Sequence, residues 1–164
     1  MEQQFIEIFN LYKNDVLRLA FSYTKNMADA EDITQTVFIK LYNNFQNFEN
    51  KSHIKKWCIK VTINTCKDFL LSAWKRKIRF FAEREENNIA FEEQNQDSFV
   101  ITTLMSLPKK YRLVIHLFYY ENYKIDEISE ILKIKKSTVL VQLSRARLIL
   151  KEKLKEVWND EKEQ

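Results

Sequence analysis

Apolar side chains recur every three or four residues along most of this chain, which is the spacing that places them on one face of an α-helix. One such stripe fills the first 24 residues, and a second runs from Ala30 to Phe45 behind Asn26, a residue type that favours the N-cap. A third stripe begins at Ile54 and continues towards Trp74, on a segment whose other side is basic. The pattern therefore predicts three helices in the first half of the chain.

The second half predicts shorter helices followed by one long helix. Asp97 marks the start of a short helix, and Pro108 marks the start of the next, because proline is tolerated in a first helical turn. A helix over residues 125–132, a break over 133–136 and a long helix from Ser137 follow. This order is typical of a helix-turn-helix, although an ordinary helical hairpin with a basic end explains the same pattern.

The long helix has two different sides when its residues are placed 100° apart. A buried seam is predicted at Val139, Leu143, Ala146, Leu150 and Leu154. Thr138, Val141 and Arg145 point roughly the opposite way. An exposed side of this kind, entered through basic residues, suits a helix that meets DNA phosphates with its first turn and base edges with its outer face.

Composition narrows the possible functions. The chain has no glycine, so it cannot build the phosphate-binding loops of Rossmann, kinase or P-loop enzymes, and no acid–histidine constellation suggests another enzyme. No apolar run approaches the ~20 residues of a membrane-spanning helix, so we expect a cytoplasmic protein without membrane insertion. Cys58 and Cys66 share one helix about 12 Å apart, which predicts reduced core thiols. His53 and His116 lack partners at ligand spacing, so neither a metal nor another cofactor is expected.

The net charge of +4 conceals a strong segregation along the chain. Residues 51–84 carry a net charge of +8 and residues 105–147 carry +5, whereas residues 85–104 between them carry −5. Two basic segments are the footprint expected of a partner with a long anionic backbone, such as a nucleic acid. A generally high lysine content is the alternative explanation.

The acidic segment is rich in Asn and Gln and has little apolar periodicity, so it is predicted to be a flexible linker. The expected fold is all-α, with two small helical domains joined by this linker and the helix-turn-helix in the C-terminal domain. The expected boundaries are residues 1–82, 83–96 and 97–164. The linker could bind in a basic channel of a partner through its negative charge, or it could act only as an inert tether.

Several segments occur together in one order. They are Asp29-Ala-Glu-Asp-Ile-Thr-Gln-Thr-Val-Phe, Trp57-Cys-Ile-Lys-Val-Thr-Ile-Asn-Thr-Cys-Lys-Asp, Leu107-Pro108 with Tyr111-Arg112, Tyr119-Tyr-Glu, Glu127-Ile-Ser-Glu-Ile-Leu, Ser137-Thr-Val and Leu143-Ser-Arg-Ala-Arg. Each is weak alone, but their collinear order resembles the extracytoplasmic-function (ECF) sigma factors, the smallest sigma subunits of bacterial RNA polymerase. The resemblance implies a chain that binds core RNA polymerase and promoter DNA, directs transcription initiation and is held by an anti-sigma factor.

The same resemblance implies three sets of site residues. The helix that binds the polymerase clamp takes Asp29, Glu31, Asp32, Gln35 and Thr36. The helix that opens the minus-ten promoter element, with the basic residues around it, takes Lys55, Lys56, Trp57, Lys60, Asn64, Lys67, Lys75, Arg76, Lys77 and Arg79. The minus-35 element is assigned to Arg112, Lys135, Lys136, Ser137, Thr138, Leu140, Val141, Gln142, Ser144, Arg145 and Arg147.

The chain departs from the family pattern at informative positions. Thr36 stands where glutamate is usual, which shifts the expected clamp contact towards Asp32 and Gln35. Common glycines are replaced by Asn122, Lys133 and Ser137. A left-handed Lys133 at the end of its helix would be strained. Leu140-Val-Gln replaces a polar stretch on the recognition helix, so the promoter specificity of relatives does not carry over.

Alternatives stay open for single residues and for the whole chain. Trp57 is either a platform for an unstacked base or a packing residue, because it also has core spacing with Ile54 and Val61. Each lysine assigned to DNA could equally well be an ordinary solvated surface residue. A stand-alone helix-turn-helix regulator, which binds duplex DNA without polymerase, is the alternative function. A helical adaptor without a nucleic-acid partner would leave the two basic segments unexplained.

Overall fold

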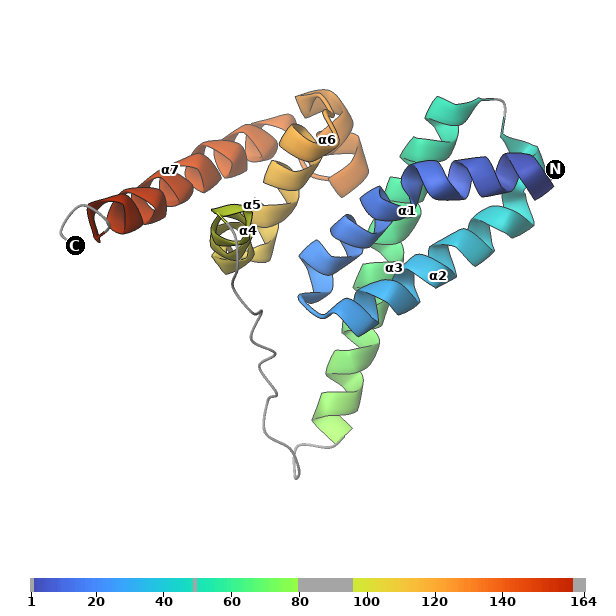
Figure 1. Ribbon diagram of the computed structural model, residues 1–164, viewed down its shortest axis with the longest axis horizontal. Coiled ribbons are helices and arrows are strands. Elements are labelled where there is room, and N and C mark those ends of the chain that lie inside the picture. The colour runs from blue at the N-terminus through green and yellow to red at the C-terminus, as the bar shows by residue number, and fades with distance from the viewer. Residues whose placement is uncertain (1, 49, 80–95, 161–164) are drawn as a thin grey trace. The chain divides into compact units, whose positions relative to one another are not determined.

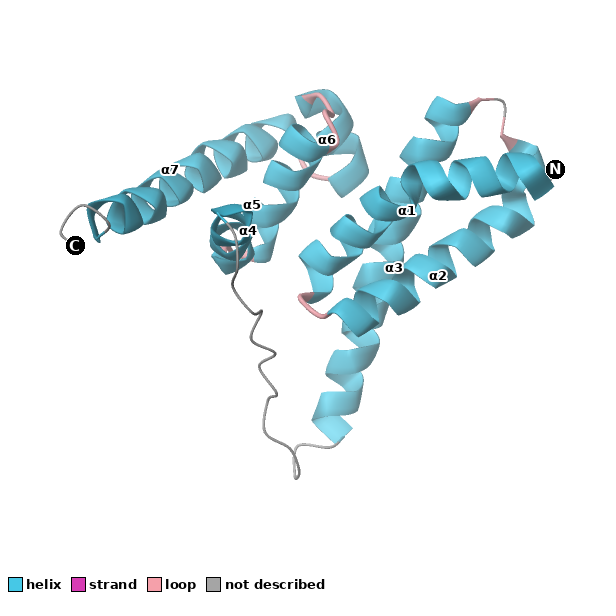
Figure 2. Cartoon of the chain, in the orientation of Figure 1, coloured by secondary structure: helices cyan, strands magenta, loops and turns pink. Residues whose placement is uncertain are grey.

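The computed structural model describes residues 2–48, 50–79 and 96–160, and the regular elements within them are all helices (Figures 1 and 2). The chain divides into two compact units, Met1–Ala90 and Phe91–Gln164. The prediction of an all-α fold with two helical domains is therefore confirmed. The predicted linker lies outside the described residues, apart from Gln96. In the part of the chain that the structure describes, no helix has the length and apolarity that crossing a membrane requires.

The N-terminal unit is a bundle of three helices, α1 (Glu2–Thr24), α2 (Met27–Asn44) and α3 (Lys51–Arg79), with a short 3-10 turn, η1 (Phe45–Asn47), after α2. Each helix packs against the other two. The core is made of the apolar stripes, and its largest fully buried side chains are Val16, Leu19, Ile33, Val37, Leu41, Ile59 and Ile63. The three stripes predict these three helices correctly.

The turn between α1 and α2 is fixed by local chemistry. Asn26 has an extended backbone, and its side-chain oxygen accepts a hydrogen bond of 3.0 Å from the Asp29 amide, as expected of an N-cap. Lys25 before it takes a left-handed conformation, with φ at 53°. This cap fixes where α2 begins, and therefore where its acidic first turns lie.

Both cysteines lie in the core of this bundle on α3, and neither forms a disulfide. Burial raises the pKa of the Cys58 thiol to about 12, since the thiolate would lose its hydration. The thiol therefore stays protonated and unreactive at neutral pH. The prediction of reduced core thiols is confirmed.

The C-terminal unit contains α4 (Gln96–Ser106), α5 (Lys109–Ile115), a π-helical turn η2 (His116–Tyr120), α6 (Ile125–Leu132) and α7 (Lys136–Asp160). Helix α7 packs against α4, α5 and α6. The core is formed mainly by Leu107, Val114, Leu117, Ile128, Val139, Leu143 and Ala146. The helix-turn-helix predicted here consists of α6 and α7.

The turn of the helix-turn-helix is closed by hydrogen bonds around a left-handed residue. Lys133 has φ 56° and ψ 44° and donates its amide to the Ser129 carbonyl, while the Ser129 hydroxyl donates to the Ile134 carbonyl over 2.6 Å. Asn122, another position where the family commonly has glycine, is also left-handed, with φ at 56°. The strain expected at Lys133 is therefore present, and asparagine tolerates the same conformation more easily than lysine does.

Helix starts in this unit differ slightly from the predicted ones. Helix α4 begins at Gln96, so Asp97 lies inside its first turn and not before it. Pro108 occupies the N-cap of α5, and Ser106 donates its hydroxyl back to Thr103 of α4. Helix α7 begins at Lys136, one residue earlier than predicted. The π-helical turn was not predicted.

Candidate nucleic-acid and polymerase interfaces

The predicted clamp-binding residues gather on the first turns of α2. Asp29 is half-buried next to the cap, and the rest of the predicted set is exposed, namely Glu31, Asp32, Gln35 and Thr36. The Thr36 hydroxyl donates to the Asp32 carbonyl over 2.9 Å, so it serves the helix itself. Carboxylates here also favour the positive end of the helix dipole, but that effect fades beyond the first turn. Asp32 and Gln35 are exposed beyond that first turn.

Two apolar side chains extend the exposed face of α2. Ile39 is 62% exposed and Tyr42 is 50% exposed, although both are large. Together with Asp32 and Gln35 they follow steps of three and four residues, so the four form one ridge, which we call the α2 ridge. Sequence reasoning missed the two apolar members. The available signal was that Ile39 and Tyr42 fall outside the buried stripe of α2.

The predicted minus-ten residues occupy the basic side of α3. Lys60, Asn64 and Lys67 are exposed at steps of four and three residues, and they share one face of the helix. Lys55 is half-buried, and its ammonium nitrogen lies 3.7 Å from an Asp15 carboxylate oxygen of α1. Lys56 is half-buried and Arg76 is exposed. Lys75, Lys77 and Arg79 belong to α3, but their side chains lie outside what the structure describes.

Trp57 has a packing contact inside its own unit. Its ring lies 5.4 Å from the ring of Phe48 in an edge-to-face arrangement, and the side chain is half-buried. Ile54 is buried and Val61 is half-buried, which agrees with the core spacing noted in the sequence. A packing role for Trp57 is therefore present, and its side chain is only partly buried.

Helix α7 presents the predicted minus-35 residues on its outer side. Leu140 is 55% exposed and Val141 is 47% exposed. Lys135, Lys136, Ser137, Ser144 and Arg145 are exposed as well, and Thr138 and Gln142 are half-buried. Leu140 and Val141 thus form an exposed apolar pair close to the basic start of the helix. The outer side of α7 is thus an apolar and basic surface.

The opposite side of α7 forms the predicted seam only in its first half. Val139, Leu143 and Ala146 are buried, whereas Leu150 is half-buried and Leu154 is 41% exposed. The prediction is therefore wrong for Leu154. Figure 1 shows α6 beside the beginning of α7, whose later turns extend away from α6.

Arg112 is not positioned as a minus-35 contact. Only 5% of the residue is exposed, and one guanidinium nitrogen donates to the carbonyls of Leu107 (2.8 Å) and Met105 (3.2 Å). Burial lowers the pKa of the guanidinium by desolvation. Its side chain holds the turn between α4 and α5 inside the unit, which corrects the expectation that it faces DNA.

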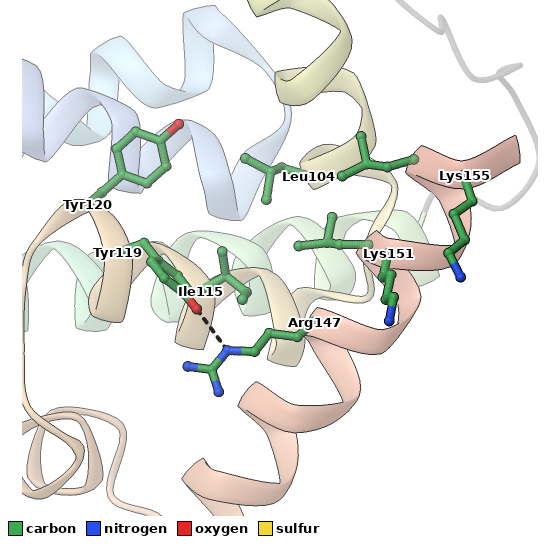
Figure 3. Close-up of a pocket in the computed structure, with 9 residues that line it drawn as sticks. Leu104, Ile115, Tyr119, Tyr120, Arg147, Lys151 and Lys155 are labelled. Carbon is green, nitrogen blue, oxygen red and sulfur yellow. Dashed lines mark hydrogen bonds between the residues drawn. The ribbon is translucent and has the colours of Figure 1, made fainter. Parts of the chain in front are cut away.

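Arg147 is exposed but engaged within the unit. Its Nε donates to the Tyr119 hydroxyl over 2.8 Å (Figure 3). Its guanidinium carbon lies 5.4 Å from the centre of the Phe118 ring. These residues lie beside a groove of about 580 Å³ that is bounded by α4, α5, η2 and α7 and includes Leu104 and Leu150. Arg147 therefore has an intramolecular role that sequence reasoning did not anticipate.

The π-helical turn and the residue after it carry a buried acid–base pair. His116 Nε2 and a Glu121 carboxylate oxygen are 3.3 Å apart, and both side chains are buried. The His116 ring also stacks on Tyr120, with ring centres 5.4 Å apart. This pair could not be predicted from the sequence, because the π-helical turn brings the two residues together. Among the residues that the structure describes, no three His, Cys, Asp or Glu side chains gather closely enough to hold a metal ion.

Comparison with known proteins identifies the two units. Residues 8–76 match the sigma-70 region 2 family, and residues 100–150 match sigma-70 region 4. The chain is similar to the RNA polymerase sigma factor SigV of Bacillus subtilis, with 34% identity over 145 residues that cover 85% of this chain and 84% of SigV. It is also similar to the ECF sigma factor SigW of Bacillus subtilis, with 27% identity over 95% of this chain and 91% of SigW.

The fold has a close counterpart among solved structures. The sigma factor RpoE of Bartonella quintana, solved with the anti-sigma factor NepR, superposes with a TM-score of 0.78 at 20% identity, covering 93% of this chain and 98% of RpoE. A two-domain helical protein with a helix-turn-helix is the class that the fold and surfaces define. The chain belongs to the ECF sigma factors and directs transcription initiation by RNA polymerase.

Proposed function

We propose that the two units divide promoter recognition between them. Residues 1–82 bind core RNA polymerase and the minus-ten element, residues 97–164 bind the minus-35 element, and residues 83–96 connect them. The observation that carries this proposal is the outer side of α7, where exposed Leu140, Val141 and Arg145 follow a basic helix start on a helix-turn-helix.

The polymerase contact is assigned to the α2 ridge. A ridge with a carboxylate and an amide at one end and large exposed apolar side chains at the other is suited to a protein partner, since apolar area supplies affinity and charge supplies specificity. Asp32 and Gln35 anchor this contact, and Asp29, Glu31 and Thr36 lie beside it.

The minus-ten contact is assigned to the basic side of α3. Lys60 and Lys67 neutralise phosphates of the opened strand, with Asn64 between them offering an amide to a base. Trp57 supplies the stacking surface next to them, an interaction worth about 1–3 kcal/mol per base. Lys55, Lys56, Lys75, Arg76, Lys77 and Arg79 attract the DNA backbone over a longer range.

The minus-35 contact places Lys135, Lys136 and Ser137 against phosphates and the outer side of α7 in the major groove. Thr138, Gln142 and Ser144 border that side, and Arg145 reads a base edge or a phosphate. Arg112 is not part of the proposed contact, because its side chain is buried and bound within the unit.

Val141, with Leu140 beside it, is expected to read thymine methyl groups. Both are apolar and about half exposed, and the thymine methyl is the apolar group of the major groove. Replacing thymine by uracil in the minus-35 element should therefore lower the affinity of the polymerase complex by about twofold to fivefold per methyl contact, in line with ~0.8 kcal/mol for a buried methylene. Filter binding at fixed salt measures this. Equal affinity for both DNAs would remove these residues from base reading.

The proposed function differs from that of a stand-alone regulator in its dependence on polymerase. Binding of a promoter fragment is measured with the purified chain alone and then with core polymerase added. A sigma factor binds the promoter poorly alone and tightly with the core enzyme. Tight, sequence-specific binding without polymerase would favour the regulator instead.

The remaining properties follow from the proposed function. The chain acts in the cytoplasm, where promoter DNA and polymerase are found, and it supplies binding surfaces without catalysing a reaction itself. An anti-sigma factor is the expected antagonist, since the similar RpoE was solved with one.

A further inference from the structure

Arg147 lies on α7, two residues after Arg145, and connects this helix to the π-helical turn. Its Nε donates to the Tyr119 hydroxyl over 2.8 Å (Figure 3). Its guanidinium carbon lies 5.4 Å and 5.6 Å from the ring centres of Phe118 and Tyr119. The side chain thus ties the middle of α7 to the segment that follows α5. A guanidinium suits this task because it stacks on rings and donates in a fixed direction at once.

The tyrosine partner is held by the π-helical turn. The Glu121 amide donates to the His116 carbonyl over 3.2 Å, which closes a turn with one residue more than an α-helical turn has. The buried His116 and Glu121 side chains approach to 3.3 Å, and Tyr120 stacks on His116. Tyr119 lies within this turn, so the turn positions the residue that Arg147 contacts.

We propose that Tyr119 and Arg147 form a clasp that fixes the rotation of α7 about its own axis. That rotation decides how Val141 and Arg145 face the major groove, so the clasp is a determinant of minus-35 specificity that does not touch DNA. Arg147 is accordingly a positioning residue and not a phosphate contact. The inference rests on the proposed function of α7.

The two roles of Arg147 predict different results. A phosphate contact depends on charge, so it survives replacement by lysine and contributes to the salt dependence of binding. A clasp depends on the planar group and on the tyrosine hydroxyl. It is lost in Arg147→Lys and also in Tyr119→Phe, which removes a single oxygen from a half-exposed ring and leaves the charge of the protein unchanged.

The experiment uses the complex of core polymerase with the full chain, on a promoter at which the wild-type complex initiates. Affinity is measured for this promoter and for one with a base substitution in the minus-35 element, over a range of salt concentrations. Tyr119→Phe should lower the ratio of the two affinities by about threefold to tenfold, the range of one hydrogen bond, with an unchanged salt slope. Arg147→Lys should do the same, and the double variant should be no worse than either single variant.

Tyr120→Phe is the matched control. Tyr120 is the next residue, borders the same groove and is similarly exposed. Its contact with His116 is made by its ring and not by its hydroxyl. Its affinity ratio should equal that of the wild type. A wild-type affinity ratio in Tyr119→Phe would overturn the clasp. A wild-type affinity ratio in Arg147→Lys, together with a reduced salt slope in Arg147→Ala, would also overturn it, because that is the result expected of a phosphate contact. A wild-type complex that ignores the minus-35 substitution would instead refute the proposed function of α7.

Discussion

Arg112→Met is expected to lower the free energy of unfolding of the C-terminal unit by about 2–3 kcal/mol. The guanidinium donates to the carbonyls of Leu107 and Met105, and only 5% of the residue is exposed. Methionine fills a similar volume but has no donor. The two carbonyls then lose the partner that closes the turn between α4 and α5, which is the main cost of the substitution.

Two opposing effects determine the size of this change. Removing a buried charge recovers its desolvation energy, which is why replacing complete buried ion pairs by apolar residues is often neutral. Here the acceptors are backbone carbonyls that cannot be removed with the arginine, so their unsatisfied bonds dominate, at about 1–3 kcal/mol each before relaxation.

Hydrogen exchange of the α5 amides in the full chain measures the stability of this unit separately from that of the N-terminal unit. Lys151→Met is the control, because it removes one positive charge from an exposed position of α7. Its effect should stay within about 0.5 kcal/mol. An equally small effect of Arg112→Met would contradict the role assigned to the guanidinium.

Asp32→Lys is expected to weaken binding of the chain to core polymerase by more than about tenfold, since charge reversal within an interface replaces attraction by repulsion. Asp32 is exposed and lies beyond the first turn of α2, so the helix itself loses little from the change. Fluorescence anisotropy of a labelled chain, titrated with core polymerase, gives the affinity.

Glu7→Lys is the matched control for this prediction. Glu7 is exposed on α1 of the same unit, and its reversal changes the net charge by the same amount. Thermal unfolding should show that both variants are folded. Equal affinities of the two variants for polymerase would mean that the α2 ridge is not the contact surface.

Much of the fold was predictable because helices and caps are local. The Asn26 cap follows from the residue type at that position, and the bounds of α6 agree with the predicted 125–132. The stripe of α7 correctly predicted the buried side chains of its first turns, Val139 and Leu143. Leu154 was misassigned because periodicity does not reveal where the neighbouring helices end.

The sites were harder to predict, because they depend on contacts between distant residues. Arg112 and Arg147 are basic residues within family motifs, and their sequence positions alone suggest DNA contacts. Only the packing of α5 and η2 reveals that one side chain holds carbonyls and the other holds Tyr119. The pair of His116 and Glu121 depends on a π-helical turn, for which the sequence contains no recognised signal.

The central claim is that this chain makes core RNA polymerase initiate at particular promoters. Run-off transcription on genomic fragments, with core polymerase and with or without the chain, tests it most directly. Discrete transcripts that require the chain, and that are lost with Asp32→Lys, are expected. Identical transcript patterns with and without the chain would contradict it.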